Sequence, residues 1–123
     1  NNETFEGNAG VDVITTNTGV DEVRYVASTD SGVGIGNRDI ITDFSTGSGD
    51  TISLWRLLET PLSFVGLSAF SNQPGQVRYI LDVNNSQTIV EIDLTGDAVA
   101  DMEIELTGLN KLAADDFILT QPV

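Results

Sequence analysis

Acidic residues return every nine positions near the start of the chain, in step with a series of apolar residues. The acidic series is Glu3, Asp12 and Asp21, and the apolar series is Phe5, Ile14 and Val23. We expect each member to stack on the next, the acids at turns and the apolar residues in a core. Stacked carboxylates repel one another unless a hard cation lies between them, and Ca²⁺ prefers such oxygen ligands. These residues therefore indicate calcium binding.

The clearest copy of the repeat, residues 7–15, reads G-N-A-G-V-D-V-I-T. It is close to the nonapeptide G-G-x-G-x-D-x-U-x, which forms a turn and a short strand of a parallel β-roll. The residues expected to surround calcium in this section are Gly7, Ala9, Gly10, Asp12, Gly19 and Asp21. The next copy has Thr16 and Asn17 where two glycines belong, so complete calcium loops are expected at about one or two levels. Ordinary hairpins with Gly-Val-Asp turns are the alternative.

Composition points to one acidic domain that binds cations. The chain has 123 residues, with 5 Lys and Arg against 19 Asp and Glu, and its net charge is −14. This charge argues against nucleic acid and anionic membrane surfaces as partners. Bound Ca²⁺ would relieve the self-repulsion of a compact acidic chain. The alternative is that the acidity only confers solubility.

Missing residue types narrow the chemistry further. The chain has no Cys and no His, which excludes disulfides, thiolate and histidine metal sites, and the usual Ser-His-Asp triad. Metal can replace disulfides as the cross-link of a secreted domain. No apolar run reaches the length of a membrane span, so no membrane insertion is expected. No signal peptide is visible, and the chain opens inside a repeat, so we expect a longer parent polypeptide.

Strand patterns dominate the rest of the chain, which predicts an all-β fold. Residues 39–44 read as a buried strand and residues 50–54 as a return strand after a Gly/Ser turn. Further strands are expected at residues 76–83, 88–94, 102–106 and 116–119, with Met102, Ile104 and Leu106 facing inward. Residues 28–37 read as an unpacked glycine-rich connector, because no phosphate-binding Gly-Lys-Ser/Thr follows. Residues 53–59 could form one or two helical turns capped by Ser53.

Taken together, these segments resemble the C-terminal region of serralysin-type metalloproteases and other RTX proteins. The matching segments are 7–12 (GNAGVD), 38–44 (RDIITDF), 49–54 (GDTISL), 64–70 (FVGLSAF), 74–79 (PGQVRY), 93–101 (DLTGDAVAD), 106–108 (LTG) and 114–119 (ADDFIL). Two positions depart from the family pattern. Ser53 stands where the family usually has Asp, and Ala98 stands where it usually has Gly.

The resemblance implies an all-β domain in which a short parallel β-roll remnant runs into an antiparallel, β-sandwich-like cap. We expect a single domain over residues 1–123, with degenerate nonapeptide repeats in residues 1–27 and the cap in residues 38–123. The resemblance also implies secretion to the extracellular space through a type I system, which reads an uncleaved signal near the C-terminus. It does not identify the enzyme or adhesin upstream.

Two further groups of carboxylates could bind calcium. Asp93, Thr95, Asp97, Val99 and Asp101 follow the spacing of positions 1, 3, 5, 7 and 9 of an EF-hand loop. The alternative is a polar turn, which Ala98 favours because a non-glycine residue resists positive φ. Asp39, Asp43 and Asp50 could gather near the glycine-rich loop, or cap turns instead.

Two enzyme- or glycan-like patterns have ordinary explanations. Glu103 and Glu105 could act as a glycosidase pair, but they alternate on one face of a strand and are expected to face solvent. Trp55, Tyr25 and Tyr79 could form a sugar-stacking platform, but scattered aromatics more often belong to a core or its rim.

The sequence therefore predicts a non-catalytic calcium-binding module that supports calcium-dependent folding and type I secretion. Its expected cofactor is Ca²⁺, and its expected partner during export is the secretion machinery. The alternative is a polysaccharide-binding module of a modular secreted enzyme.

Overall fold

Parallel strands stack in the first half of the chain, as the nonapeptide spacing predicts. The structure is a computed structural model that describes residues 3–46 and 49–122; this part of the chain contains strands and 3₁₀ turns but no α-helix. Sheet A contains, in spatial order, β1 (Thr4–Phe5), β3 (Glu22–Arg24), β5 (Thr51–Ser53) and β10 (Phe117–Ile118). All neighbouring strands of sheet A are parallel.

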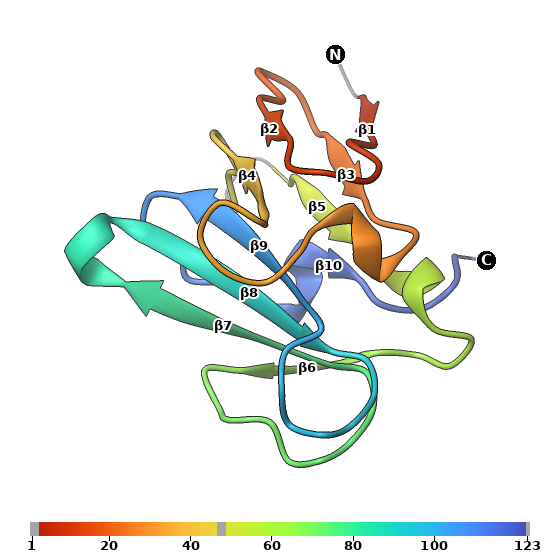
Figure 1. The fold of residues 1–123 in the computed structure, drawn as a ribbon. Helices are drawn as coiled ribbons and strands as arrows, with labels where there is room; N and C mark the ends of the chain where they lie inside the picture. Colours follow the sequence, from red (N-terminus) through yellow and green to blue (C-terminus); the bar gives the residue numbers. More distant parts are fainter. Residues whose placement is uncertain (1–2, 47–48, 123) are drawn as a thin grey trace.

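Sheet B is larger and mixes both strand directions (Figure 1). Its spatial order is β2 (Val13–Ile14), β4 (Asp39–Ile41), β9 (Met102–Thr107), β8 (Gln87–Asp93), β7 (Gln76–Asp82) and β6 (Ser63–Gly66). The pairs β2–β4, β4–β9 and β6–β7 are parallel, whereas β9–β8 and β8–β7 are antiparallel. The predicted all-β fold, with a short parallel roll running into an antiparallel cap, is confirmed.

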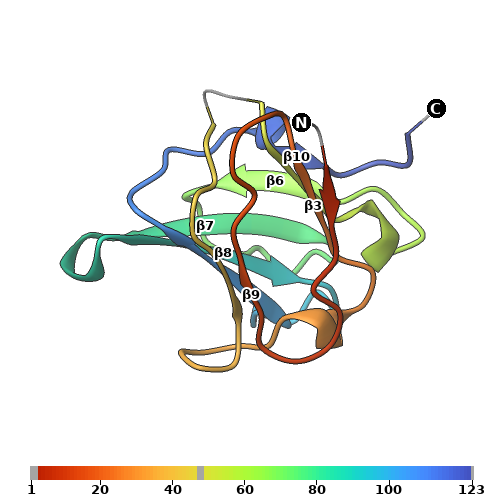
Figure 2. The ribbon, with the colours of Figure 1, turned by 90° about the horizontal axis from the view of Figure 1, so that it is seen from above.

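Consecutive strands of the roll alternate between the two sheets, so the repeat closes after two nonapeptides. Val23 pairs with Phe5 in sheet A, whereas Ile14, which lies between them in sequence, pairs with Ile41 in sheet B. The expectation that each member stacks directly on the next is therefore wrong, because one coil takes a strand from each sheet. The coil is visible from above as the red-to-yellow part of the chain in Figure 2.

The strands that follow the glycine-rich loop continue the roll. The sequence predicts that residues 50–54 return beside residues 39–44, but β4 lies in sheet B and β5 in sheet A. Strand β4 instead pairs with β2, and β5 pairs with β3. Strands from residues 1–27 and 38–123 thus share both sheets, and the division of the chain at the glycine-rich loop stays a prediction.

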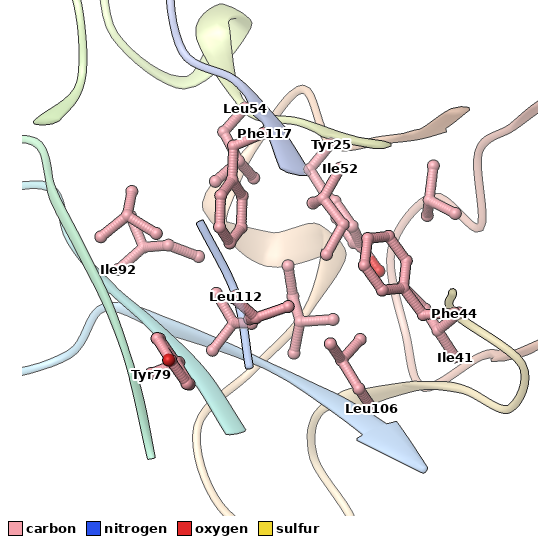
Figure 3. Close-up of a cluster of buried hydrophobic side chains, with 14 of the residues drawn as sticks. Tyr25, Ile41, Phe44, Ile52, Leu54, Tyr79, Ile92, Leu106, Leu112 and Phe117 are labelled. Carbon is pink, nitrogen blue, oxygen red and sulfur yellow. The ribbon is translucent and has the colours of Figure 1, made fainter. Parts of the chain in front are cut away.

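Apolar side chains of the two sheets meet in one core (Figure 3). Ile52 of sheet A and Ile41 of sheet B are completely buried there. The strict alternation of residues 102–106 is confirmed, since Met102, Ile104 and Leu106 are each 0% exposed. Burial of these side chains removes apolar area from water, which is the main stabilising contribution in such a fold.

The glycine-rich loop packs against β9, contrary to the expected unpacked connector. It begins with the 3₁₀ turn η1 (Ser28–Asp30). The amide of Glu103 donates to Gly32 O over 3.1 Å, and the hydroxyl of Ser31 donates to Glu103 O. Polar contacts to the backbone hold this loop, so its low apolar content wrongly predicted that it would not pack.

Glu103 and Glu105 lie under this loop, so the expectation that they face solvent is wrong for Glu103. Glu103 is 7% exposed. Arg38 pairs with Glu103 Oε1 at 2.8 Å and with Glu105 Oε1 at 3.0 Å. These two carboxylates therefore anchor the loop on sheet B.

Short 3₁₀ turns occupy the remaining connections. They are η2 (Trp55–Leu57), η3 (Val83–Asn85) at the tip of the predicted β7–β8 hairpin, and η4 (Ala114–Asp116) before β10. The N-cap of η2 is Leu54 rather than the predicted Ser53, which is part of β5. The side chain of Leu54 makes no capping hydrogen bond, so core burial of Leu54 rather than capping positions η2.

We expect Ile104→Ala to lower the free energy of unfolding by about 2–5 kcal/mol, because it opens a cavity in the core. Ile35→Ala is the matched control, since Ile35 is 81% exposed, and its effect should stay within about 0.5 kcal/mol. Urea unfolding in saturating calcium measures both. Equal effects would contradict the burial of β9.

Candidate metal sites

The loop between β8 and β9 gathers three carboxylates. Asp93, Asp97 and Asp101 each offer an oxygen within 4.8 Å of the other two, and no other described His, Cys, Asp or Glu residues form such a group of three. Asp93 ends β8, and Asp101 directly precedes β9. Two paired strands therefore fix the two ends of the loop and bring its acids together.

Backbone amides orient these carboxylates before any ion binds. Asp93 accepts hydrogen bonds from Gly96 and Ala98, each over 2.8 Å. Asp101 Oδ2 accepts from the amides of Leu94 and Thr95, at 2.7 and 3.1 Å. Burial acts to raise the pKa of Asp93, but the amides of Gly96 and Ala98 outweigh it and hold this pKa below its ordinary value. Asp93 is therefore ionised at neutral pH.

The two other predicted ligands of this loop lie close by. The hydroxyl of Thr95 is 3.3 Å from Asp101 Oδ2 and 3.5 Å from Asp93 Oδ1, so it lies within the group. The amide of Val99 donates to Asp97 Oδ1 over 3.0 Å. That the carbonyl oxygen of Val99 is the ligand at the seventh position of this loop stays a prediction.

Ala98 adopts the conformation that its side chain was expected to resist. Its φ is +66°, in the left-handed region. A non-glycine residue there costs roughly 1–2 kcal/mol. The hydrogen bond from its amide to Asp93 compensates part of this cost.

A second set of acids forms ladders along the two edges of the roll. Asp21 Oδ1 accepts from the amide of Glu3 at 2.9 Å, and Asp50 Oδ1 accepts from the amide of Asp21 at 3.0 Å. On the other edge, Asp39 Oδ1 accepts from the amide of Asp12 at 2.9 Å. Each aspartate thus holds the coil before it in register. The predicted acidic series consequently splits into two columns.

The second oxygen of three ladder aspartates is buried without a partner. Oδ2 of Asp12, Asp21 and Asp39 is inaccessible and accepts no hydrogen bond. An unpaired buried carboxylate oxygen is costly, so a cation or a proton is needed there. Asp12 Oδ2 lies 2.5 Å from the position that a Cβ on Gly7 would occupy. Gly7 therefore leaves space beside this oxygen that any side chain would fill.

Charge crowding around Asp39 has a measurable consequence. Burial raises the pKa of Asp39 to about 6, although the amide of Asp12 opposes this; the charge of Asp12 adds to the rise. Burial also raises the pKa of the Tyr25 phenol well above its ordinary value, and the charge of Asp39 raises it further. The Tyr25 hydroxyl lies close enough to Asp39 to lower the pKa of this carboxyl in part, but it does not reach normal hydrogen-bond geometry with a described residue. Burial and the neighbouring acidic charges therefore disfavour the ionised form of Asp39 in the folded roll.

Asp39, Asp43 and Asp50 do not gather, contrary to one expectation. Asp39 and Asp50 lie in different columns, and Asp43 binds the amides of Thr16 and Asn17 at 2.8 and 2.6 Å. Burial acts to raise the pKa of Asp43, but the amides of these two residues lower it overall. Each of the three acids therefore serves a different turn, and their part in metal binding stays a prediction.

The turns of both nonapeptides use left-handed residues at matching positions. Gly10 and Gly19 have φ values of +97° and +113°, and Asn8 and Asn17 have values of +62° and +64°. Asn17 replaces a glycine of the repeat without changing the turn, because Asn tolerates this region. Ala9 and Gly10 are exposed and Gly19 is half-buried, so these predicted ligands lie at the rim of the roll.

The structure also corrects the sugar-stacking platform and adds one acidic residue that was missed. Tyr25 and Tyr79 are 0% and 6% exposed, so they belong to the core and cannot stack on a sugar, whereas Trp55 is half-buried. Asp30 was not predicted, yet its Oδ2 accepts from the amides of Val26 and Ala27 at 3.0 and 3.1 Å. Asp30 lies nine residues after Asp21 and so continues the acidic series, and this spacing is the signal that could have identified it.

Comparison with known proteins supports the same architecture. No curated protein sequence matches the chain. The solution structure of the AlgE6R2 subunit of the Azotobacter vinelandii mannuronan C5-epimerase is similar, with 24% identity and a TM-score of 0.66, over 98% of this chain and 72% of that one. The AlgE6R3 subunit of the same epimerase gives 21% identity and a TM-score of 0.47, over 95% and 66%.

Among the described residues, no helix is long and apolar enough to cross a membrane.

The family model for the Peptidase M10 serralysin C terminal matches residues 2–119. This match covers the roll, both carboxylate columns and the loop between β8 and β9. The chain belongs to the Peptidase M10 serralysin C-terminal family.

Proposed function

We propose that this chain is a non-catalytic calcium-binding module that supports the folding and export of a secreted protein. The observation that carries the proposal is the set of three buried carboxylate oxygens without partners, on Asp12, Asp21 and Asp39. Asp12 and Asp39 lie on one edge of the roll and Asp21 on the other, so cations bound on both edges would satisfy these oxygens. The family match supports a role beside a catalytic domain rather than as one.

Calcium fits these sites better than other common metals. All candidate ligands are oxygens, and the chain has no His or Cys for zinc, copper or iron. Mg²⁺ requires a rigid octahedral arrangement and loses its water reluctantly, whereas Ca²⁺ accepts six to eight oxygens in irregular loops. We assign the first site to Asp93, Thr95, Asp97, Val99 and Asp101. We assign the roll sites to Gly7, Ala9, Gly10, Asp12, Gly19, Asp21 and Asp39, with Asp43 and Asp50 as outer members.

Calcium would couple folding to location. Without the ion, the ladder aspartates place unpaired charge inside a chain of net charge −14, which opposes the compact state. Low cytosolic calcium would then leave the chain unfolded and suitable for a type I exporter, and high extracellular calcium would fold it outside.

Polysaccharide binding is a second candidate function of the same module. Trp55 is half-buried beside Arg56, and both line a pocket of about 590 Å³. The similar AlgE6R2 subunit belongs to an enzyme named for a polysaccharide, mannuronan. Affinity electrophoresis through gels that contain different glycans tests this function, and unretarded migration in every gel would contradict it.

Calcium removal should lower the melting temperature by roughly 10 °C for each site that had been filled at about 100 times its dissociation constant. Differential scanning calorimetry in calcium and in chelator, at matched ionic strength, measures the change. Asp93→Asn should reduce the calcium effect, whereas Asp115→Asn, an exposed change of equal charge, should not. An unchanged melting temperature in chelator would overturn the proposal.

Asp39→Asn should have opposite effects with and without calcium. Because the folded state raises the pKa of Asp39 from 3.8 to about 6, the calcium-free protein loses stability as pH rises through this window. Asparagine keeps the acceptor for the Asp12 amide but not the charge, so the variant in chelator should be more stable at pH about 7. Calcium should stabilise this variant less than it stabilises the parent protein, so in calcium the variant should be the less stable of the two. Equal destabilisation in both conditions would show that Asp39 is only a structural acceptor.

Deletion of residues 115–123 from a full-length parent should abolish secretion, if the C-terminal tail carries the export signal. Asp12→Ala with Asp21→Ala is the control, because it should permit export of a less stable product. Immunoblots of medium and cells measure the secreted fraction. Normal secretion of the truncated parent would place the signal elsewhere.

A further inference from the structure

Arg56 is a half-buried cation that forms no ion pair with a described acid, although the protein is strongly acidic. The chain carries 19 acidic and 5 basic residues. Arg24, Arg38 and Arg78 each pair with a glutamate, at distances between 2.6 and 3.3 Å. Arg56 pairs with no described acid, and its Nη1 is enclosed without a hydrogen-bond partner. Because Arg56 lines a pocket and forms no ion pair with a described acid, its positive charge is available to an anion from outside.

The position of Arg56 is fixed by an aromatic ring. Its guanidinium carbon lies 4.1 Å from the centroid of the Trp55 ring. Stacking on tryptophan immobilises the planar guanidinium and leaves its edge for hydrogen bonding. Both residues belong to η2, which follows the buried end of β5. The pair is thus held by the core and presents its donors with little loss of entropy on binding.

This pair lines the pocket of about 590 Å³, between η2 and the segment that follows β10. The volume is within the range of small-molecule sites. Leu57 and Pro61 supply apolar surface, and Thr120 and Gln121 supply hydroxyl and amide groups. None of the predicted calcium ligands lines this pocket. A ligand here can therefore be distinguished from an ion in the roll.

We propose that this pocket binds a carboxylate-bearing sugar of an acidic polysaccharide, with the carboxylate paired in bidentate fashion to Arg56. This rests on the second candidate function and names its site and ligand class. Planar carboxylates match the guanidinium fork. Sugar rings combine apolar C–H faces with hydroxyls, as the pocket combines Trp55 and Pro61 with Thr120 and Gln121.

Glu59 also lines the pocket, and it sets the orientation of the ligand. Its carboxylate can accept from sugar hydroxyls but repels a second carboxylate at close range. The acidic group must therefore point to Arg56, with the hydroxyl-bearing side toward Glu59.

The net charge of −14 repels a polyanion only over about one Debye length, roughly 8 Å at physiological salt. Salt screens this repulsion as well as the Arg56 ion pair, so binding should depend less on salt than an ion pair alone would.

Fluorescence of the single tryptophan provides a direct readout, since Trp55 is the only one in the chain. The calcium-saturated protein is titrated with hexamers of a uronic acid, of a neutral hexose and of a sulfated hexose, and with an acidic peptide. We expect saturable quenching with the uronate, at least about tenfold weaker binding of the neutral hexamer, and weak or no binding of the peptide.

Substitutions then assign the site. Arg56→Gln should weaken uronate binding at least about tenfold, and Arg56→Lys by several-fold, because lysine keeps the charge but loses the fork. Glu59→Gln should strengthen uronate binding. Lys111→Gln is the matched control, since it removes one exposed positive charge that does not line the pocket. Melting temperatures in calcium confirm that every variant is folded.

The possible results separate the site from the functions on which it depends. Uronate binding that is unaffected by Arg56→Gln in a folded protein would overturn this site, although polysaccharide binding itself would stand. Equal affinity for neutral and uronate hexamers would overturn the role of the carboxylate. Stronger binding of the sulfated hexamer or of the peptide would assign the pocket to that ligand instead. No saturable binding of any hexamer would overturn both the site and polysaccharide binding, while the calcium dependence of melting would be unaffected.

Discussion

The fold depends on aspartates whose carboxylates accept hydrogen bonds from the backbone of the preceding coil. Asp21, Asp39 and Asp50 each accept a hydrogen bond from the amide of an acidic residue in the preceding coil. This contact sets the register of the roll, and because its donors here are amides of Glu3, Asp12 and Asp21, it also brings carboxylates close together. The same geometry leaves buried oxygens on Asp12, Asp21 and Asp39 unsatisfied. The register of the roll and the proposed need for a cation therefore have one origin.

Local patterns in the sequence predicted individual strands well but not how distant strands pair. The alternation at residues 102–106 and the β7–β8 hairpin were confirmed, because both follow from neighbouring residues. The period of nine marked the strands of the roll, yet sheet pairing follows a separation of 18 residues between Glu3 and Asp21 and of 27 between Asp12 and Asp39. The glycine-rich loop accounts for the longer separation. No local signal announces that Ser31 and Arg38 hold this loop on β9.

For the candidate sites too, the sequence predicted groups within one loop but not groups that depend on how distant strands pair. The spacing of Asp93, Asp97 and Asp101 located a real cluster, because one short loop between paired strands brings these residues together. Asp39, Asp43 and Asp50 were expected either to gather or to cap turns, and sheet topology separates them. Ala98 was expected to oppose the loop, and the amide bond to Asp93 holds it in the left-handed region instead. Asp30 continues the acidic series at a period of nine, whereas Arg56 and the pocket beside η2 depend on tertiary packing and left no periodic trace.

Strand β9 belongs to both halves of the molecule at once. It pairs in parallel with β4 of the roll and antiparallel with β8 of the hairpin, and three of its side chains are completely buried. Separating the halves would expose these side chains and break two strand pairings together. An ion in the loop that precedes β9 and an ion in the roll would then stabilise the same strand from opposite sides. Thermodynamic linkage requires that each ion strengthens the binding of the other whenever binding drives folding, without any contact between the sites. Calcium uptake by this module should consequently be cooperative, and unfolding should remove all of its ions in one transition.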